Sequence, residues 1–133
     1  MTLPRQVIEP ENDKLNVSRN FNLPHSPGIR AGELIFLSGM VSIDPATGQR
    51  NLGTVAQETR QILSNMRHML QSAGSSLERV VKVNVLIHSM LEFENMNEVY
   101  REFFPKDPPA RTTCGVQLSQ GFKVEIECVA LAG

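Results

Sequence analysis

Arg111 and two glutamates further along the chain, Glu125 and Glu127, are the residues whose types and spacing could do chemistry. Arg111 directly follows Pro108-Pro109-Ala110, where the prolines donate no backbone hydrogen bonds and hold the chain extended. A guanidinium on a mostly buried sheet needs an anionic partner. That partner is either a glutamate of the protein, in a structural salt bridge, or the carboxylate of a small ligand in a bidentate clamp. The residue types alone leave both possibilities open.

The segment around these residues has the pattern of two strands, at 112–118 and 123–131, joined by a short turn. Side chains alternate along a strand, so Glu125 and Glu127 share the face opposite the second strand's apolar residues. We predict that the two strands form a hairpin. In a tight hairpin Arg111 lies near the far end of the partner strand, so a site that uses both Arg111 and Glu125 needs a second subunit.

The preceding sequence predicts, in order, a β-hairpin, a helix, a strand and a second helix. The ranges are 29–31 with 34–42, then 54–73, 80–88 and 89–104. Thr54 and Gln57 form a capping box for the first helix, and Glu58 is expected on its solvated side. In the strand we expect Val81 on the apolar face. Gly39, inside a strand, indicates either a bulge or the close approach of a ligand or another chain.

These elements predict an α+β domain in which two amphipathic helices cover one face of a mixed sheet of about six strands. The other face carries Lys82, Asn84 and the two glutamates among apolar residues. No helix remains to cover it, which indicates a subunit contact.

The composition is typical of a globular chain, with 133 residues, 41% hydrophobic and 20% charged. We expect one domain over 1–133, with 1–22 as a partly irregular arm. A net charge of −1 and 5% aromatic residues disfavour a nucleic-acid surface. No apolar run approaches the roughly 20 residues of a membrane span, and the first twenty residues lack the apolar block of a secretory signal. We therefore expect a cytoplasmic protein.

Common catalytic and binding motifs are absent: there is no Walker loop, GxGxxG, HExxH, CxxC or GxSxG. His25, His68 and His88 have no metal-ligand spacing with each other or with the cysteines, so no metal site is expected. Cys114 with His25 could form a nucleophile pair, but a strand cysteine is more often an inert small apolar residue.

Several motifs together resemble the RidA/YjgF family, the reactive-intermediate (imine/enamine) deaminases, also known as L-PSP endoribonuclease-like proteins. The matching segments run from residue 23 to residue 131, and the most specific are Pro109-Ala-Arg-Thr112 and Val124-Glu-Ile-Glu127. The others are Ile29–Gly39, Asp44–Gly48, Ala73–Leu77, Val80–Lys82 and Phe93–Phe104. The resemblance implies a chorismate-mutase-like α+β fold and a homotrimer with a pocket in each cleft between subunits.

The resemblance also implies roles for individual residues. Arg111 would bind the substrate carboxylate and Glu125 would orient or activate the attacking water. The family members' other pocket residues correspond to Ser38, Gly39, Asn97 and Tyr100. The family often has a small residue or cysteine two places after the arginine; Thr113 stands there and Cys114 follows, so either one could line the pocket. His25 replaces the tyrosine that often closes the pocket, which leaves the preferred substrate open.

The implied reaction is the hydrolysis of 2-imino acids, formed from enamines such as 2-aminoacrylate, to 2-oxo acids and ammonia. The imine carbon is already electrophilic, so the resemblance implies no cofactor. Two alternatives stay open: deamination of a ring-cleavage product such as 2-aminomuconate, and a non-catalytic metabolite-binding or chaperone-like trimer. RNA cleavage, also reported in the family, is disfavoured by the charge.

Overall fold

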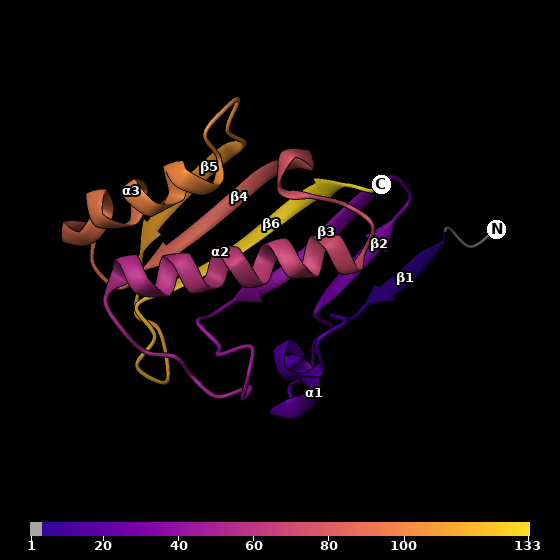
Figure 1. Cartoon of the computed structure of the whole chain (residues 1–133), viewed down its shortest axis with the longest axis horizontal. Helices are drawn as coiled ribbons and strands as arrows, with labels where there is room; N and C mark the ends of the chain where they lie inside the picture. The colour runs from indigo at the N-terminus through magenta and orange to yellow at the C-terminus, as the bar shows by residue number, and fades with distance from the viewer. Residues whose placement is uncertain (1–3) are drawn as a thin grey trace.

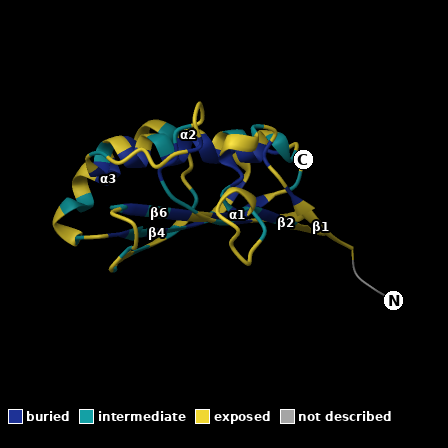
Figure 2. Ribbon diagram, turned by 90° about the horizontal axis from the view of Figure 1, so that it is seen from below, coloured by how far each residue is buried: buried dark blue, intermediate teal, exposed yellow. Residues whose placement is uncertain are grey.

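A mixed six-stranded sheet with helices on one face forms the body of the protein, in a computed structural model that describes residues 4–133 (Figures 1 and 2). Its strand order is β1-β2-β3-β6-β4-β5. The strands are β1 (Arg5–Ile8), β2 (Gly28–Ala31), β3 (Leu34–Met40), β4 (Val80–Ile87), β5 (Ala110–Gly115) and β6 (Val124–Leu131). The α-helices are α1 (Val17–Asn20), α2 (Val55–Ser72) and α3 (Phe93–Phe103), and short 3-10 turns lie at Asp13–Leu15, Leu77–Arg79 and Met90–Glu92. The predicted α+β class and six-stranded mixed sheet are confirmed.

Helices α2 and α3 lie side by side over the same sheet face, as predicted (Figure 2). The capping box at the start of α2 is present, because Thr54 accepts a hydrogen bond from the Gln57 amide and the Gln57 side chain accepts one from Thr54. The short helix α1 and the turn before it, within the N-terminal arm, were not predicted. They pack near the end of β3, where they contribute to the cavity described below (Figure 1).

The expectation that Glu58 is solvated is wrong, because its side chain is completely buried. Its carboxylate accepts hydrogen bonds from the backbone amides of Gly53, at 3.2 Å, and Lys123, at 2.9 Å. The Lys123 ammonium group lies 3.7 Å away. Glu58 therefore ties the segment before β6 to the start of α2.

The predicted hairpin between the last two strands is also wrong, because β4 lies between β5 and β6. β5 runs parallel to β4, and β6 pairs antiparallel with β4 on one side and β3 on the other. The connection from β5 to β6 passes the end of β4, where the Val116 amide donates to the Ile87 carbonyl and the His88 amide donates to the Lys123 carbonyl. β6 thus becomes a central strand and β5 an edge strand.

A register shift between Val80 and Lys82 corrects the predicted facing of β4. Val80 is buried in the core and Val81 is exposed, which is the reverse of the facing predicted for these two residues. Beyond the shift, Val83, Val85 and Ile87 are completely buried under the helices.

The sheet face opposite the helices is uncovered within the described chain (Figure 2). It exposes Phe36, Val81 and Leu131, each more than two fifths accessible. Polar side chains lie on the same face, including Asn84, which donates a hydrogen bond to Glu127 at 3.3 Å. This mixture of apolar and paired polar groups matches the predicted composition of the open face.

Candidate active site

Arg111 lies on the helix-facing side of edge strand β5, opposite Val83 in the register with β4. Its guanidinium carbon is 4.7 Å from the ring centroid of Tyr100 and 5.5 Å from that of Phe93, distances at which cation–π attraction operates. One guanidinium nitrogen is 3.9 Å from the Met96 sulfur. Helix α3 thus supplies a cradle of aromatic and thioether groups that fixes the cation without neutralising it.

Within residues 4–133, no carboxylate oxygen comes within the 4.0 Å of a salt bridge to Arg111. The alternative of an intrachain bridge to Glu125 or Glu127 is therefore not realised. A half-buried guanidinium with no anion is an incomplete arrangement, since charged groups away from water are normally paired.

Three buried side-chain oxygens on α3 and β5, the elements that hold Arg111, have no hydrogen-bond partner among the described residues: Asn97 Oδ1, Tyr100 Oη and Thr113 Oγ1. Asn97 and Tyr100 are one turn apart on α3, and Thr113 follows Arg111 by two positions on β5, so its side chain shares the same face. Burial raises the pKa of Tyr100 to about 12 although the Arg111 charge opposes the shift, so the phenol stays a hydrogen-bond donor. We call Arg111 and these three residues the Arg111 cluster.

Such orphaned groups point to a missing partner, because each buried polar atom without a hydrogen bond costs roughly 1–3 kcal/mol. Together they offer one cation, one hydroxyl donor, one amide oxygen and one further hydroxyl. That set suits a small molecule with a carboxylate and a polar neighbouring atom.

Cys114 is not in this cluster, because strand alternation turns it to the opposite face, where it is exposed. His25, the other member of the disfavoured nucleophile pair, precedes β2, which three strands separate from β5. The sequence left open whether Thr113 or Cys114 lines the pocket, and the placement of the two side chains favours Thr113.

A second group of predicted residues gathers on the other side of the molecule, around Glu125. Glu125 alternates with the buried Val124 and Ile126 and so projects from the open sheet face. Its carboxylate lies directly against Gly39, where an added Cβ atom would overlap Glu125 Oε2. The strand glycine is therefore required by a close approach, and the β3–β6 register shifts at the same place.

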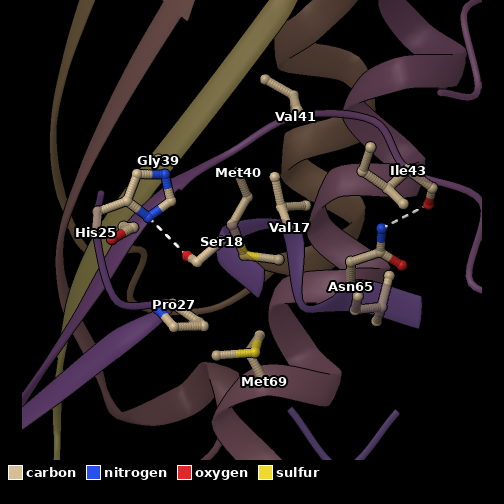
Figure 3. A pocket seen from close by; sticks show the side chains of 12 residues that line it. Val17, Ser18, His25, Pro27, Gly39, Met40, Val41, Ile43, Asn65 and Met69 are labelled. Carbon is tan, nitrogen blue, oxygen red and sulfur yellow. Dashed lines mark hydrogen bonds between the residues drawn. The ribbon is translucent and has the colours of Figure 1, made fainter. Parts of the chain in front are cut away.

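The electrostatics of Glu125 are those of a carboxylate in an unfavourable environment. Burial is the largest cause that raises its pKa, the neighbouring carboxylate of Glu127 raises it further, and the charge of His25 acts in the opposite direction. His25 itself is exposed, and its Nδ1 lies 2.7 Å from the Ser18 hydroxyl (Figure 3). Ser38 uses its hydroxyl to bind the Ser26 carbonyl. We call Glu125, Gly39, His25 and Ser38 the Glu125 cluster.

The sequence did not single out Ser18, the buried hydrogen-bond partner of His25. Nothing in its local sequence separates it from other polar residues of the arm. The sequence also assigned no role in the site to Phe93 and Met96, although both contact the guanidinium. The sequence shows their spacing relative to Tyr100 on α3, but it does not show that Arg111 on β5 lies against them.

The two clusters lie on opposite sheet faces within one chain. Arg111 aligns with Val83, which faces the helices, whereas Glu125 aligns with Leu86 on the open side. One chain alone therefore cannot bring the guanidinium and the carboxylate onto one ligand. The predicted hairpin implied the same separation, but that hairpin does not exist; the actual cause is the facing of the two strands.

Neither a metal site nor a membrane-spanning helix is present in the described part of the chain. No group of three or more histidine, cysteine, aspartate or glutamate side chains is arranged to hold a metal ion there. No helix of residues 4–133 combines the length and apolarity needed to cross a bilayer.

Comparison with known protein families identifies the family to which the chain belongs. The family model described as "Endoribonuclease L-PSP" matches residues 19–132, most of the chain. The protein belongs to this family, which is the RidA/YjgF family that the motifs indicated. Its cytoplasmic location stays a prediction.

Individual relatives agree with this membership. A RutC family protein of Pyrococcus horikoshii is 42% identical over 108 residues, covering 80% of this chain and 86% of the relative. The human 2-iminobutanoate/2-iminopropanoate deaminase is 38% identical over 111 residues, covering 83% and 81%. The solved structure of Escherichia coli TdcF with bound serine superposes with a TM-score of 0.76 at 31% identity, covering 83% of this chain and 89% of that one. These relatives include named imine deaminases.

Proposed function

We propose that the protein is a cofactor-independent deaminase that hydrolyses 2-imino acids to 2-oxo acids and ammonia, in sites formed between the subunits of a homotrimer. The observation that carries the proposal is the Arg111 cluster. It combines a guanidinium held against aromatic rings, with no carboxylate in salt-bridge range among residues 4–133, and three buried oxygens that have no partner there. Relatives named as imine deaminases support the same reaction class.

In this proposal the Arg111 guanidinium holds the substrate carboxylate through two parallel hydrogen bonds. The Tyr100 hydroxyl, Asn97 amide and Thr113 hydroxyl provide further contacts that fix the imine's orientation. A carboxylate ligand of similar size is consistent with TdcF, which was solved with bound serine. Holding the reactants in an attack geometry supplies much of the acceleration that such a reaction needs.

Glu125 from a neighbouring subunit would then take a proton from water while the water oxygen bonds to the imine carbon. The imine nitrogen gains a proton, which gives a carbinolamine. Glu125, which has given the water's proton to the imine nitrogen, then accepts the carbinolamine's hydroxyl proton and passes it to the amino nitrogen as the C–N bond breaks. Ammonia leaves, and the 2-oxo acid remains. A carboxylate whose pKa is raised is a stronger base than an ordinary glutamate, which suits this role.

The uncovered sheet face and the separation of the two clusters support the trimer. Phe36, Val81 and Leu131 form an apolar surface that a second copy of the chain would cover. Docking of that face would also bring Glu125 of one copy into reach of Arg111 of another.

The test measures imine hydrolysis and the mass of the assembly in solution. Imines are generated from amino acids by an amino acid oxidase, and hydrolysis is followed as protection from trapping by semicarbazide. We expect hydrolysis of 2-iminopropanoate and 2-iminobutanoate, and a sedimentation-equilibrium mass about three times the 14.8 kDa of the chain. A monomer, or a trimer that hydrolyses no imine, contradicts the proposal.

A further inference from the structure

A small cavity of about 40 Å³ lies beside the Glu125 cluster, between the N-terminal arm, the end of β3 and helix α2 (Figure 3). His25, Ser38 and Gly39, three members of the cluster, form part of its lining. The remaining walls are mostly apolar and come from Leu15, Val17, Met40, Val41, Ile43 and Met69. The cavity thus shares three of its lining residues with the Glu125 cluster.

Three polar side chains that line this cavity already have hydrogen-bond partners in the protein. The Ser18 hydroxyl is bonded to His25, and the Ser38 hydroxyl to the Ser26 carbonyl. Asn65 donates to the Ile43 carbonyl at 2.8 Å and accepts from the Gln61 amide at 3.0 Å (Figure 3). Ser18, Ser38 and Asn65 are thus already hydrogen-bonded within the protein, and a mostly apolar cavity of this kind favours an apolar group over water.

We propose that this cavity is the specificity pocket for the substrate's side chain, and that the protein prefers 2-imino acids with unbranched aliphatic side chains longer than methyl. The inference rests on the proposed function and names the substrate class of the same site. A single water needs about 10–15 Å³ by this measure, so 40 Å³ accommodates roughly three carbon atoms in a row.

The Ser18–His25 pair shapes the mouth of the pocket. His25 is exposed, whereas Ser18 is only 8% accessible and belongs to α1. The hydrogen bond between them holds the imidazole beside Gly39 rather than over the apolar walls (Figure 3). Ser18 is therefore a positioning residue, and His25 fills only part of the space that a larger ring would close.

If the cavity binds the substrate's side chain, kcat/KM should depend on the length of that side chain. Each methylene moved from water into an apolar site raises kcat/KM about fourfold. We expect this increase from 2-iminopropanoate through 2-iminobutanoate and 2-iminopentanoate to 2-iminohexanoate, over about three added carbons, and no further gain for longer chains.

Leu15→Phe tests the assignment by filling the cavity, and Leu52→Phe, the same change at an exposed position outside it, is the matched control. Leu15→Phe should abolish the chain-length increase, so that kcat/KM for the three longer imines no longer exceeds kcat/KM for 2-iminopropanoate, whereas Leu52→Phe should keep the increase. If Leu15→Phe does not fold, Val17→Ile adds one methyl group and should shorten the optimum by about one carbon. Ser18→Ala should weaken the preference, and Ser18→Thr should restore it.

The outcomes separate this inference from the proposed function. Equal kcat/KM for all four imines in the wild type, or an equal loss for all of them in Leu15→Phe, overturns the pocket assignment and leaves imine hydrolysis intact. Absence of hydrolysis for every imine overturns the proposed function instead. In that case binding of unreactive alkanoates, from propanoate to hexanoate, is measured calorimetrically: a chain-length gain lost in Leu15→Phe supports the pocket, and a flat series rejects it.

Discussion

The Arg111 cluster and the Glu125 cluster are built in opposite ways. Within residues 4–133, the first places a cation against aromatic rings with no carboxylate in salt-bridge range. The second places the Glu125 carboxylate near that of Glu127, and the charge of an exposed histidine acts in the opposite direction. Each cluster holds the charge that the other lacks. This difference is what the proposed function uses, because there the two clusters, supplied by different subunits, act on opposite sides of one ligand.

Glu125→Gln should have the largest effect on the reaction, because it removes the proposed base while keeping the shape of the side chain. We expect kcat/KM to fall about 10²–10⁴-fold. In the wild type, activity should decline as the pH falls through a pKa above the ordinary range of a glutamate, since only the carboxylate accepts the water's proton. A pH–rate profile of both proteins checks this.

The same change should not reduce stability. A carboxyl group whose pKa is raised by folding stabilises the folded state below its unfolded pKa, and this contribution is lost as the pH rises through the folded pKa. At neutral pH the permanently neutral amide introduced by Glu125→Gln should therefore leave the melting temperature equal or higher. A clear decrease in melting temperature would mean that Glu125 is a structural partner.

Arg111→Ala should reduce kcat/KM at least about a hundredfold, because two charge-assisted hydrogen bonds to one carboxylate are lost and ~2.7 kcal/mol corresponds to two powers of ten. Arg111→Lys keeps the charge but loses the planar fork, so it should remain clearly impaired. Melting temperature, oligomeric state and imine hydrolysis are measured on the same samples. A folded trimer with full activity would end the deaminase proposal, and loss of the trimer in both variants would favour a salt bridge between subunits.

Thr113→Val should have a smaller effect, about three- to tenfold on kcat/KM, because it removes one neutral hydrogen bond and conserves volume. Since Thr113 Oγ1 has no partner among residues 4–133, the unliganded variant should be no less stable. Cys114→Ala is the control and should leave kinetics unchanged. The reverse result would assign the pocket position to Cys114.

His25→Tyr should have the smallest effect on the rate with small imines. The larger ring would cover part of the cavity mouth, so the ratio of activities between long and short imino acids should drop by more than stability changes. Equal ratios in both proteins would show that His25 only packs or faces solvent.

Local patterns predicted the local structure well. The capping box of Thr54 and Gln57 and the stripe of α3 depend on residues within one or two turns, and both helices formed where expected. Alternation also predicted the facing of Glu125 correctly. Thr113 could have been preferred over Cys114 by the same rule, because residues two apart on a strand share a face.

Long-range pairing could not be predicted in this way. Nothing near Glu58 in sequence indicates that the amide of Lys123 would reach it and make burial favourable. Likewise, the pattern of two strands and a turn is typical of a hairpin, and only the insertion of β4 between them reverses that interpretation. The opposition of Arg111 and Glu125 follows from this strand order, so the incomplete character of each cluster appears only in three dimensions.

The most direct test of the central claim is complementation between two inactive variants. Arg111→Ala and Glu125→Gln chains are co-expressed in equal amounts, so that mixed trimers form. If each site takes Arg111 from one subunit and Glu125 from the next, about one quarter of the sites in randomly mixed trimers contain both residues, and about that fraction of wild-type activity should return. Activity that stays at the level of the separate variants, in trimers shown to be mixed, would contradict a site shared between subunits.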